Sequence, residues 1–237
     1  MPLVFAVSAL VLSRISISDT SATRTSQNLA LDIRDGLTYI LKHRVILVLL
    51  AMALLMNLGG APLGIILPVF SEWLGSSAHA YGYMMAALSA GMVLGFWQAG
   101  AASARGSVAI VLSASVGTLF VVLASVLWLP PTIGLIVAFA ILVLAGFLMG
   151  TANVRIATIM QLATDADYLG RVGSVGRMIS LVASPLSLAA FGPLVDGKGP
   201  GFALLVSGLV ILLAGLPFVG SSVWQYRSST EASPEGR

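Results

Sequence analysis

The sequence has no cysteine and few charged residues. Without cysteine it can form neither a disulfide framework nor a thiolate metal site. Charged residues make up 9% of the 237 residues, whereas soluble domains carry roughly 25%. Hydrophobic residues make up 58%, so a soluble fold of this length would lack the polar surface needed to stay dissolved. The composition therefore indicates a protein that resides in a membrane.

Long uncharged runs account for this composition, and they cover residues 45–71, 80–104, 106–154, 178–195 and 199–226. A spanning helix needs about 20 apolar residues. The third run is about twice that length and carries Pro130-Pro131 near its middle, which predicts two helices joined by a tight turn. We therefore predict an all-α polytopic membrane protein with six transmembrane helices, at 45–69, 81–104, 107–129, 133–154, 175–195 and 201–222.

The charges between these runs predict the orientation. Six crossings place both ends of the bundle on one side, and every basic residue except Lys198 falls on that side. Membrane proteins concentrate Lys and Arg in cytoplasmic loops, so both termini are predicted to be cytoplasmic. The loop cations that we assign to the cytoplasmic side include Arg105, Arg155, Arg171 and Arg177.

The remaining segments flank the bundle, which we place at residues 45–222. Residues 1–13 are apolar, and we interpret them as the end of a preceding transmembrane helix, with a signal peptide as the alternative. Residues 14–44 form a predicted cytoplasmic connector. Its second part has the pattern of an amphipathic helix, which either lies on the membrane surface or extends the next span. Residues 223–237 are predicted to be a cytoplasmic tail.

Sequence signals of catalysis are missing. The chain has no glycine-rich phosphate loop followed by Lys and Ser or Thr, and no span pairs a nucleophile with a base. Its two histidines cannot make a metal site alone. We expect no enzyme activity, no catalytic residue, no metal and no cofactor. The basic residues mark topology, so we expect the lipid bilayer and no nucleic acid as a partner.

Two amides are candidates for lining a cavity. Asn57 lies at the centre of the first span, followed by Gly59-Gly60 and Pro62, which can loosen the helix and expose carbonyl groups. An amide at this depth needs a partner, so it either forms an interhelical hydrogen bond or faces a cavity. Gln98 has the same chemistry nearer the cytoplasmic end, where it could instead extend to the interface.

Small residues predict where helices pack closely. Gly91-x3-Gly95 and Gly146-x3-Gly150 match the spacing that lets two membrane helices approach along their backbones. Such a contact can be static, or it can slide when helices rock against each other. Pro185 lies inside the fifth span and predicts a kink, because proline removes a helix hydrogen bond; a kink could act as a hinge.

Several segments occur in a characteristic order. They are 32–44, Gly146-x3-Gly150-x2-Asn153, Met160-Gln161-Leu162, Leu169-Gly170-Arg171-Val172, Ser184-Pro185-Leu186 and Gly192-Pro193-Leu194-Val195-Asp196. Together they resemble the C-terminal half of a major facilitator superfamily transporter, in the bacterial drug-efflux branch that includes macrolide and siderophore exporters. One departure is the segment 95–106, which lacks the acidic residue of the family's loop after an even-numbered helix.

The resemblance implies a fragment or half-length exporter, a C-terminal half-bundle in the inner membrane of a prokaryote. Its helices would be numbers seven to twelve, with nine and twelve facing lipid and the others lining a cavity. Substrate-binding residues would be Asn57, Gln98 and Asn153. Gating or hinge positions would be Gly59, Gly60, Gly91, Gly95, Gly146, Gly150 and Pro185. It would move a small lipophilic compound outward by alternating access, together with a missing N-terminal half or a second copy. The alternative is a six-helix membrane subunit or scaffold that does not transport.

Overall fold

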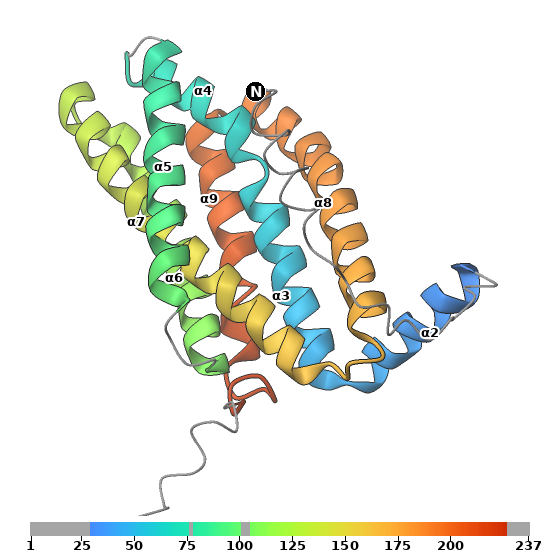
Figure 1. The fold of residues 1–237 in the computed structure, drawn as a ribbon. Helices are drawn as coiled ribbons and strands as arrows, with labels where there is room; N and C mark the ends of the chain where they lie inside the picture. Colours follow the sequence, from blue (N-terminus) through green and yellow to red (C-terminus); the bar gives the residue numbers. More distant parts are fainter. Residues whose placement is uncertain (1–28, 76–77, 101–104, 227–237) are drawn as a thin grey trace, which may run out of the picture.

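The computed structural model describes residues 29–75, 78–100 and 105–226 (Figure 1). All regular structure in these ranges is helical, and 6 helical segments are long and apolar enough to cross a membrane. The chain is therefore an all-α polytopic membrane protein, as the sequence predicted. The predicted helix end at 1–13 lies outside the described residues, as do the first part of the connector and most of the tail.

The bundle follows a short helix, α2 (Leu29–Lys42), which lies at one end of it (Figure 1). The six spans are α3 (Arg44–Gly60) with α4 (Leu63–Trp73), α5 (Ala78–Ala99), α6 (Gly106–Ser125) with η1 (Val126–Trp128), α7 (Pro131–Ala163), α8 (Leu169–Lys198), and α9 (Pro200–Leu212) with η2 (Leu216–Phe218). Leu129 and Pro130 separate η1 from α7, which begins at Pro131, at the tight turn that the sequence predicted.

Three helices differ most in length from the predicted spans. α7 continues to Ala163 and α8 begins at Leu169, so both extend into the predicted cytoplasmic region. α9 ends at Leu212, and the chain then turns back toward the start of α6. Val223, which the sequence placed in the tail, is fully buried there. The backbone N–H of Gly106 donates a hydrogen bond to the carbonyl oxygen of Tyr226 at 3.1 Å.

The first span is interrupted between α3 and α4. Ala61 and Pro62 keep right-handed helical backbone angles, so the interruption affects the hydrogen-bond ladder more than the direction of the chain. Proline has no N–H to donate to the carbonyl oxygen four residues earlier, which belongs to Leu58. The hydroxyl of Ser187 in α8 donates to that carbonyl instead, and the hydroxyl of Ser207 in α9 donates to the carbonyl of Gly59.

The predicted glycine motifs bring α5 and α7 into backbone contact. A Cβ atom added to any of the four glycines would collide with a carbonyl oxygen of the other helix: Gly91 with Val143, Gly95 with Phe147, Gly146 with Leu88 and Gly150 with Met92. The hydroxyl of Thr151 donates to the Phe147 carbonyl of its own helix at 2.8 Å and also lies 3.3 Å from the carbonyl oxygen of Gly95. The sequence prediction of close packing at these glycines is confirmed. Whether the two helices slide remains a prediction.

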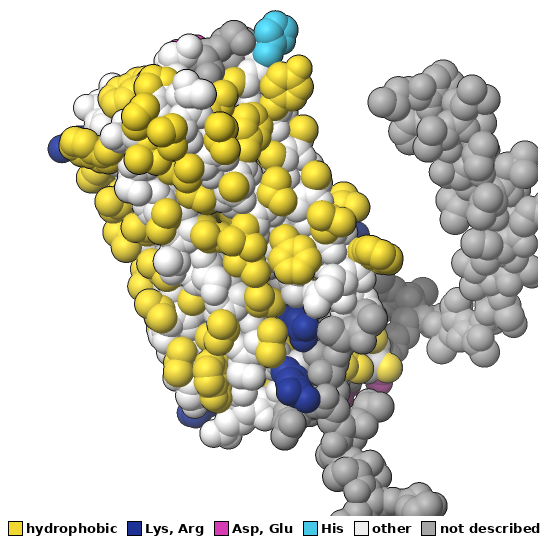
Figure 2. All heavy atoms as spheres, turned by 90° about the vertical axis from the view of Figure 1, so that its left-hand side faces the viewer, with side chains coloured by type: hydrophobic (Ala, Val, Ile, Leu, Met, Phe, Trp, Pro, Cys, Tyr) yellow, Lys and Arg dark blue, Asp and Glu magenta, His cyan; other side chains and the backbone are white. Residues whose placement is uncertain are grey.

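Most of the described charged side chains lie toward the ends of the bundle. Figure 2 shows hydrophobic side chains over most of one face, with sparse Lys and Arg side chains mainly toward the lower end. That end carries α2, the starts of α3, α6 and α8, and the end of α7. At the opposite end α8 passes into α9 through Gly199, whose φ of 82° is in the region that glycine favours.

Candidate functional site

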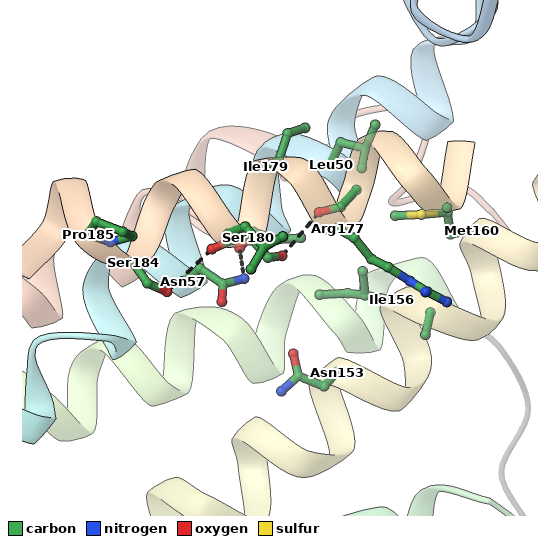
Figure 3. A pocket seen from close by; sticks show the side chains of 15 residues that line it. Leu50, Asn57, Asn153, Ile156, Met160, Arg177, Ile179, Ser180, Ser184 and Pro185 are labelled. Carbon is green, nitrogen blue, oxygen red and sulfur yellow. Dashed lines mark hydrogen bonds between the residues drawn. The ribbon is translucent and has the colours of Figure 1, made fainter. Parts of the chain in front are cut away.

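A pocket of about 850 Å³ lies between α3, α7 and α8. It extends from the middle of the bundle, at Asn57 and Pro185, toward the end that carries α2, at Met160 and Gly173. Most of its lining is aliphatic. The polar side chains among the described lining residues are Asn57, Asn153, Arg177, Ser180 and Ser184 (Figure 3). The space thus combines an aliphatic wall with polar groups from three helices.

Asn57 brings its amide to the inner end of this pocket. Its Nδ2 donates a hydrogen bond to the carbonyl oxygen of Ala53, one turn earlier in α3, at 2.8 Å. The interhelical bond that was one expectation from the sequence is therefore replaced by a bond within the helix. The amide oxygen faces the pocket, where Figure 3 shows Asn57 extending from α3 and Asn153 from α7. Both predicted asparagines thus line the same space.

A smaller cavity of about 160 Å³ continues this space toward the interrupted helix. It shares Asn57, Asn153 and Ser184 with the main pocket and adds Gly60 and Ala61. The interruption of the first span therefore borders the polar end of the pocket. Discontinuous helices often frame binding sites in transporters, because their irregular backbone can be satisfied only where it lines a cavity or contacts protein.

The α8 wall was not predicted from the sequence. Gly173, Arg177, Ser180 and Ser184 follow one another at intervals of three or four residues, so they share one face of the helix. Ser180 donates to the carbonyl oxygen of Gly176 at 3.1 Å, and Ser184 donates to that of Ser180 at 3.3 Å. Both hydroxyls therefore use their protons within α8, and their oxygens can still accept hydrogen bonds. The same spacing in the sequence could have identified this face.

The predicted cytoplasmic arginines occupy different environments. Arg105 precedes α6, and Arg171 lies at the start of α8, with its guanidinium 5.5 Å from the ring centroid of Tyr168. Arg155 lies inside α7 and is buried. Arg177 lines the pocket, and in Figure 3 its side chain reaches from α8 toward Ile156 and Met160 of α7. It is the one charged residue among the described lining residues.

Other predicted site residues lie elsewhere. Gln98 is exposed near the end of α5 and lines none of the described pockets. The four glycines of the α5–α7 contact are likewise outside the pocket. Gly59 packs on α9, where an added Cβ would collide with Ile211. Pro185 lines the pocket inside α8, which continues as one helix through it.

A polar cluster fixes α2 to the α7–α8 connection, at the end of the bundle toward which the pocket extends. The Tyr39 hydroxyl donates to Oδ2 of Asp165 at 3.0 Å and accepts from the Asp165 N–H at 3.1 Å. The Tyr39 ring stacks on Tyr168 and His43, with centroids 4.1 and 4.0 Å apart. Burial raises the pKa of Tyr39, against the opposing effect of the Asp165 N–H. The hydroxyl therefore stays protonated and able to donate at neutral pH.

No protein-family model, curated protein or solved structure matches this chain. The functional conclusion therefore has to come from the membrane bundle and its pocket.

Proposed function

We propose that the chain is a facilitator-type half of a secondary transporter, which exports a small and largely apolar compound by alternating access. The observation that supports this best is the pocket at Asn57 and Asn153. Polar side chains are costly at membrane depth and normally face a cavity or another polar group. Here two amides and two serines converge on a space large enough for a small molecule, with aliphatic walls around it.

The interrupted first span supports the same proposal. The carbonyls next to Pro62 are bonded by hydroxyls from α8 and α9, so the continuity of α3 and α4 depends on neighbouring helices. A change in the position of α8 would therefore alter the hydrogen bonding of the span that carries Asn57. In alternating access, helices move around a site near the midplane, and this coupling would link such a movement to the pocket.

The proposed orientation is both termini in the cytoplasm of a prokaryote, in the inner membrane. The pocket would then open toward the cytoplasm, because it reaches the end where α2 and most described basic residues lie. The cysteine-free sequence permits a direct test with an impermeant maleimide. Gly197→Cys should be labelled in intact cells, and Lys42→Cys only after the cells are opened. The reverse pattern would contradict the orientation.

A facilitator site lies between two six-helix bundles. The α8 wall leaves several large apolar side chains exposed: Met178, Leu181, Val182 and Leu186. We propose that a second bundle, from another half or a second copy, closes the pocket along α8. On its own the described bundle would then not export. Robust export by a demonstrated monomer would contradict this part of the proposal.

The central experiment asks whether the pocket changes access. Ala157 is exposed on the pocket wall, so Ala157→Cys should react with maleimide from the cytoplasmic side in inside-out vesicles. A transported compound should protect it and shift some reactivity to the outer side. Leu144→Cys is the matched control, because it lies on the same helix but outside the described pockets. The compound should neither protect this cysteine nor shift its reactivity to the outer side. A scaffold subunit would show no ligand-dependent change at Ala157→Cys.

A further inference from the structure

Arg177 gives the pocket a charge that its other described lining residues do not balance. The aliphatic wall includes Ile156, Ile179 and Leu181, and no aspartate or glutamate is among the described residues that line the space. The sequence alone groups Arg177 with loop cations that set topology. In the structure its side chain extends over the pocket toward α7 (Figure 3).

The polar groups lie at two opposite ends of the pocket. Arg177 lies two turns before Ser184 on α8, which corresponds to about 10 Å along the helix axis. Ser184 and Asn57 line the same inner end of the pocket. A ligand that touches both ends needs a polar atom at the inner end, an apolar body in the middle and a charge complementary to Arg177 at the outer end.

We propose that the pocket binds an amphipathic anion, with its carboxylate, sulfonate or phosphate at Arg177 and its apolar body directed toward Asn57. A guanidinium binds such groups through paired hydrogen bonds, and bonds to charged groups are stronger than neutral ones. The aliphatic wall holds the body by removing apolar surface from water. This inference rests on the proposed function, because it specifies the substrate class of the same pocket.

Binding is measured on the full chain in phosphatidylcholine nanodiscs, with radiolabelled decanoate at an alkaline pH at which it is ionised. Decanol and decyltrimethylammonium serve as neutral and cationic competitors with the same tail. Decanoate should bind best, and Arg177→Gln should weaken it by about tenfold or more while decanol binding changes little. Arg177→Lys should retain part of the preference. Arg34→Gln removes a charge from exposed α2 at the same end and should leave binding unchanged.

The possible results distinguish failure of the anion assignment from failure of the proposed transport function. Equal binding of the three probes, or equal loss with Arg34→Gln and Arg177→Gln, would overturn the anion assignment and leave a pocket for neutral compounds. Failure of all three probes to bind, in protein whose thermal unfolding is normal, would count against the transport proposal as well. Displacement of decanoate by phosphatidylglycerol added to the nanodiscs would assign Arg177 to a lipid headgroup and would also overturn the inference.

Discussion

The glycines of the α5–α7 pair and the glycines of α8 have opposite surroundings. Along the pair, each motif glycine meets a backbone carbonyl of the facing helix, so there is no room for any side chain. Along α8, nothing lies within 4 Å of a Cβ added at Gly170, Gly173, Gly192 or Gly197. Only 22% of the most apolar stretch of α8 is buried, against 39% for α7. One region is held by backbone contact, whereas the other borders open space.

This difference predicts which helices stay fixed and which helix moves. A backbone-to-backbone contact tolerates little displacement, because packed interfaces are not continuously deformable. α8 is held by side-chain contacts, among them the bond from Ser187 to Leu58, and Tyr168 just before its start stacks on Tyr39. We expect the α5–α7 pair to behave as a rigid unit and α8 to be the helix that moves. The following predictions test that contrast, from the largest effect on stability to the smallest.

The largest effect is expected from adding a methyl group to the rigid pair. Gly146→Ala would place its Cβ against the carbonyl oxygen of Leu88, and such overpacking typically costs about 1–3 kcal/mol. Gly192→Ala is the matched control on α8, where the added methyl meets open space and should be neutral or slightly stabilising. Thermal unfolding in one detergent compares the two. Equal losses in unfolding temperature would remove the distinction between the regions.

How much of this contrast the sequence predicted depends on the kind of signal. Apolar runs and glycine spacing are local, so the spans and the close approach at Gly91 and Gly146 could be predicted directly. The spacing of Gly173, Arg177, Ser180 and Ser184 could have identified a polar face of α8, but not that this face borders a pocket, which depends on the positions of α3 and α7. Arg177 is the clearest case: the sequence assigned it to the cytoplasmic charges near the start of the fifth predicted span, and only the packing of α8 beside α3 and α7 places it on the pocket wall. The burial of Val223 has no local signal either.

A smaller loss is expected where α8 bonds the interrupted span. Ser187→Ala removes the donor to the Leu58 carbonyl, and intramembrane hydrogen bonds are worth about 0.6 kcal/mol. Pro62→Ala would supply an N–H at the position that a continuous helix uses for that carbonyl. The cost of Ser187→Ala should therefore shrink in a Pro62→Ala background. A double-mutant cycle on unfolding free energies measures this coupling.

The control for that cycle is Ser115→Ala, whose hydroxyl bonds only to Val111 of its own helix. Its cost should be the same with proline or alanine at position 62. If Ser187 and Ser115 showed the same independence from Pro62, the hydroxyl of Ser187 would not be substituting for the missing N–H.

A local effect is expected at the other end of α8. Tyr39→Phe keeps the stacked ring and removes the hydroxyl that bonds Asp165, so α2 should exchange its amide hydrogens faster while the bundle is unchanged. Because the pKa of Tyr39 is raised in the folded chain, the unfolded state loses its proton first as pH increases past the ordinary value of 10.0. Its stabilisation is therefore complete below that pH and declines above it. The Phe variant should lack this loss of stability at alkaline pH. The same dependence of unfolding free energy on alkaline pH in both proteins would contradict the prediction.

The smallest effect on stability, and the most informative one for function, is expected at Asn57. Its amide bonds only within α3 in the described structure, so Asn57→Ala should change unfolding by less than about 0.6 kcal/mol. Because its oxygen faces the pocket, the same change should weaken binding of 10-hydroxydecanoate, whose terminal hydroxyl can donate to that oxygen, and should leave decanoate binding nearly unchanged. In a complete transporter it should weaken transport of compounds that carry such a donor. Gln98→Ala removes an equivalent amide from the exposed end of α5 and should change neither. Binding and thermal stability measured on the same samples decide the question. If Asn57→Ala lost stability but bound 10-hydroxydecanoate normally per folded molecule, the amide would only stabilise the helix next to the interruption. The polar contact at the inner end of the pocket would then be assigned to Asn153 and Ser184.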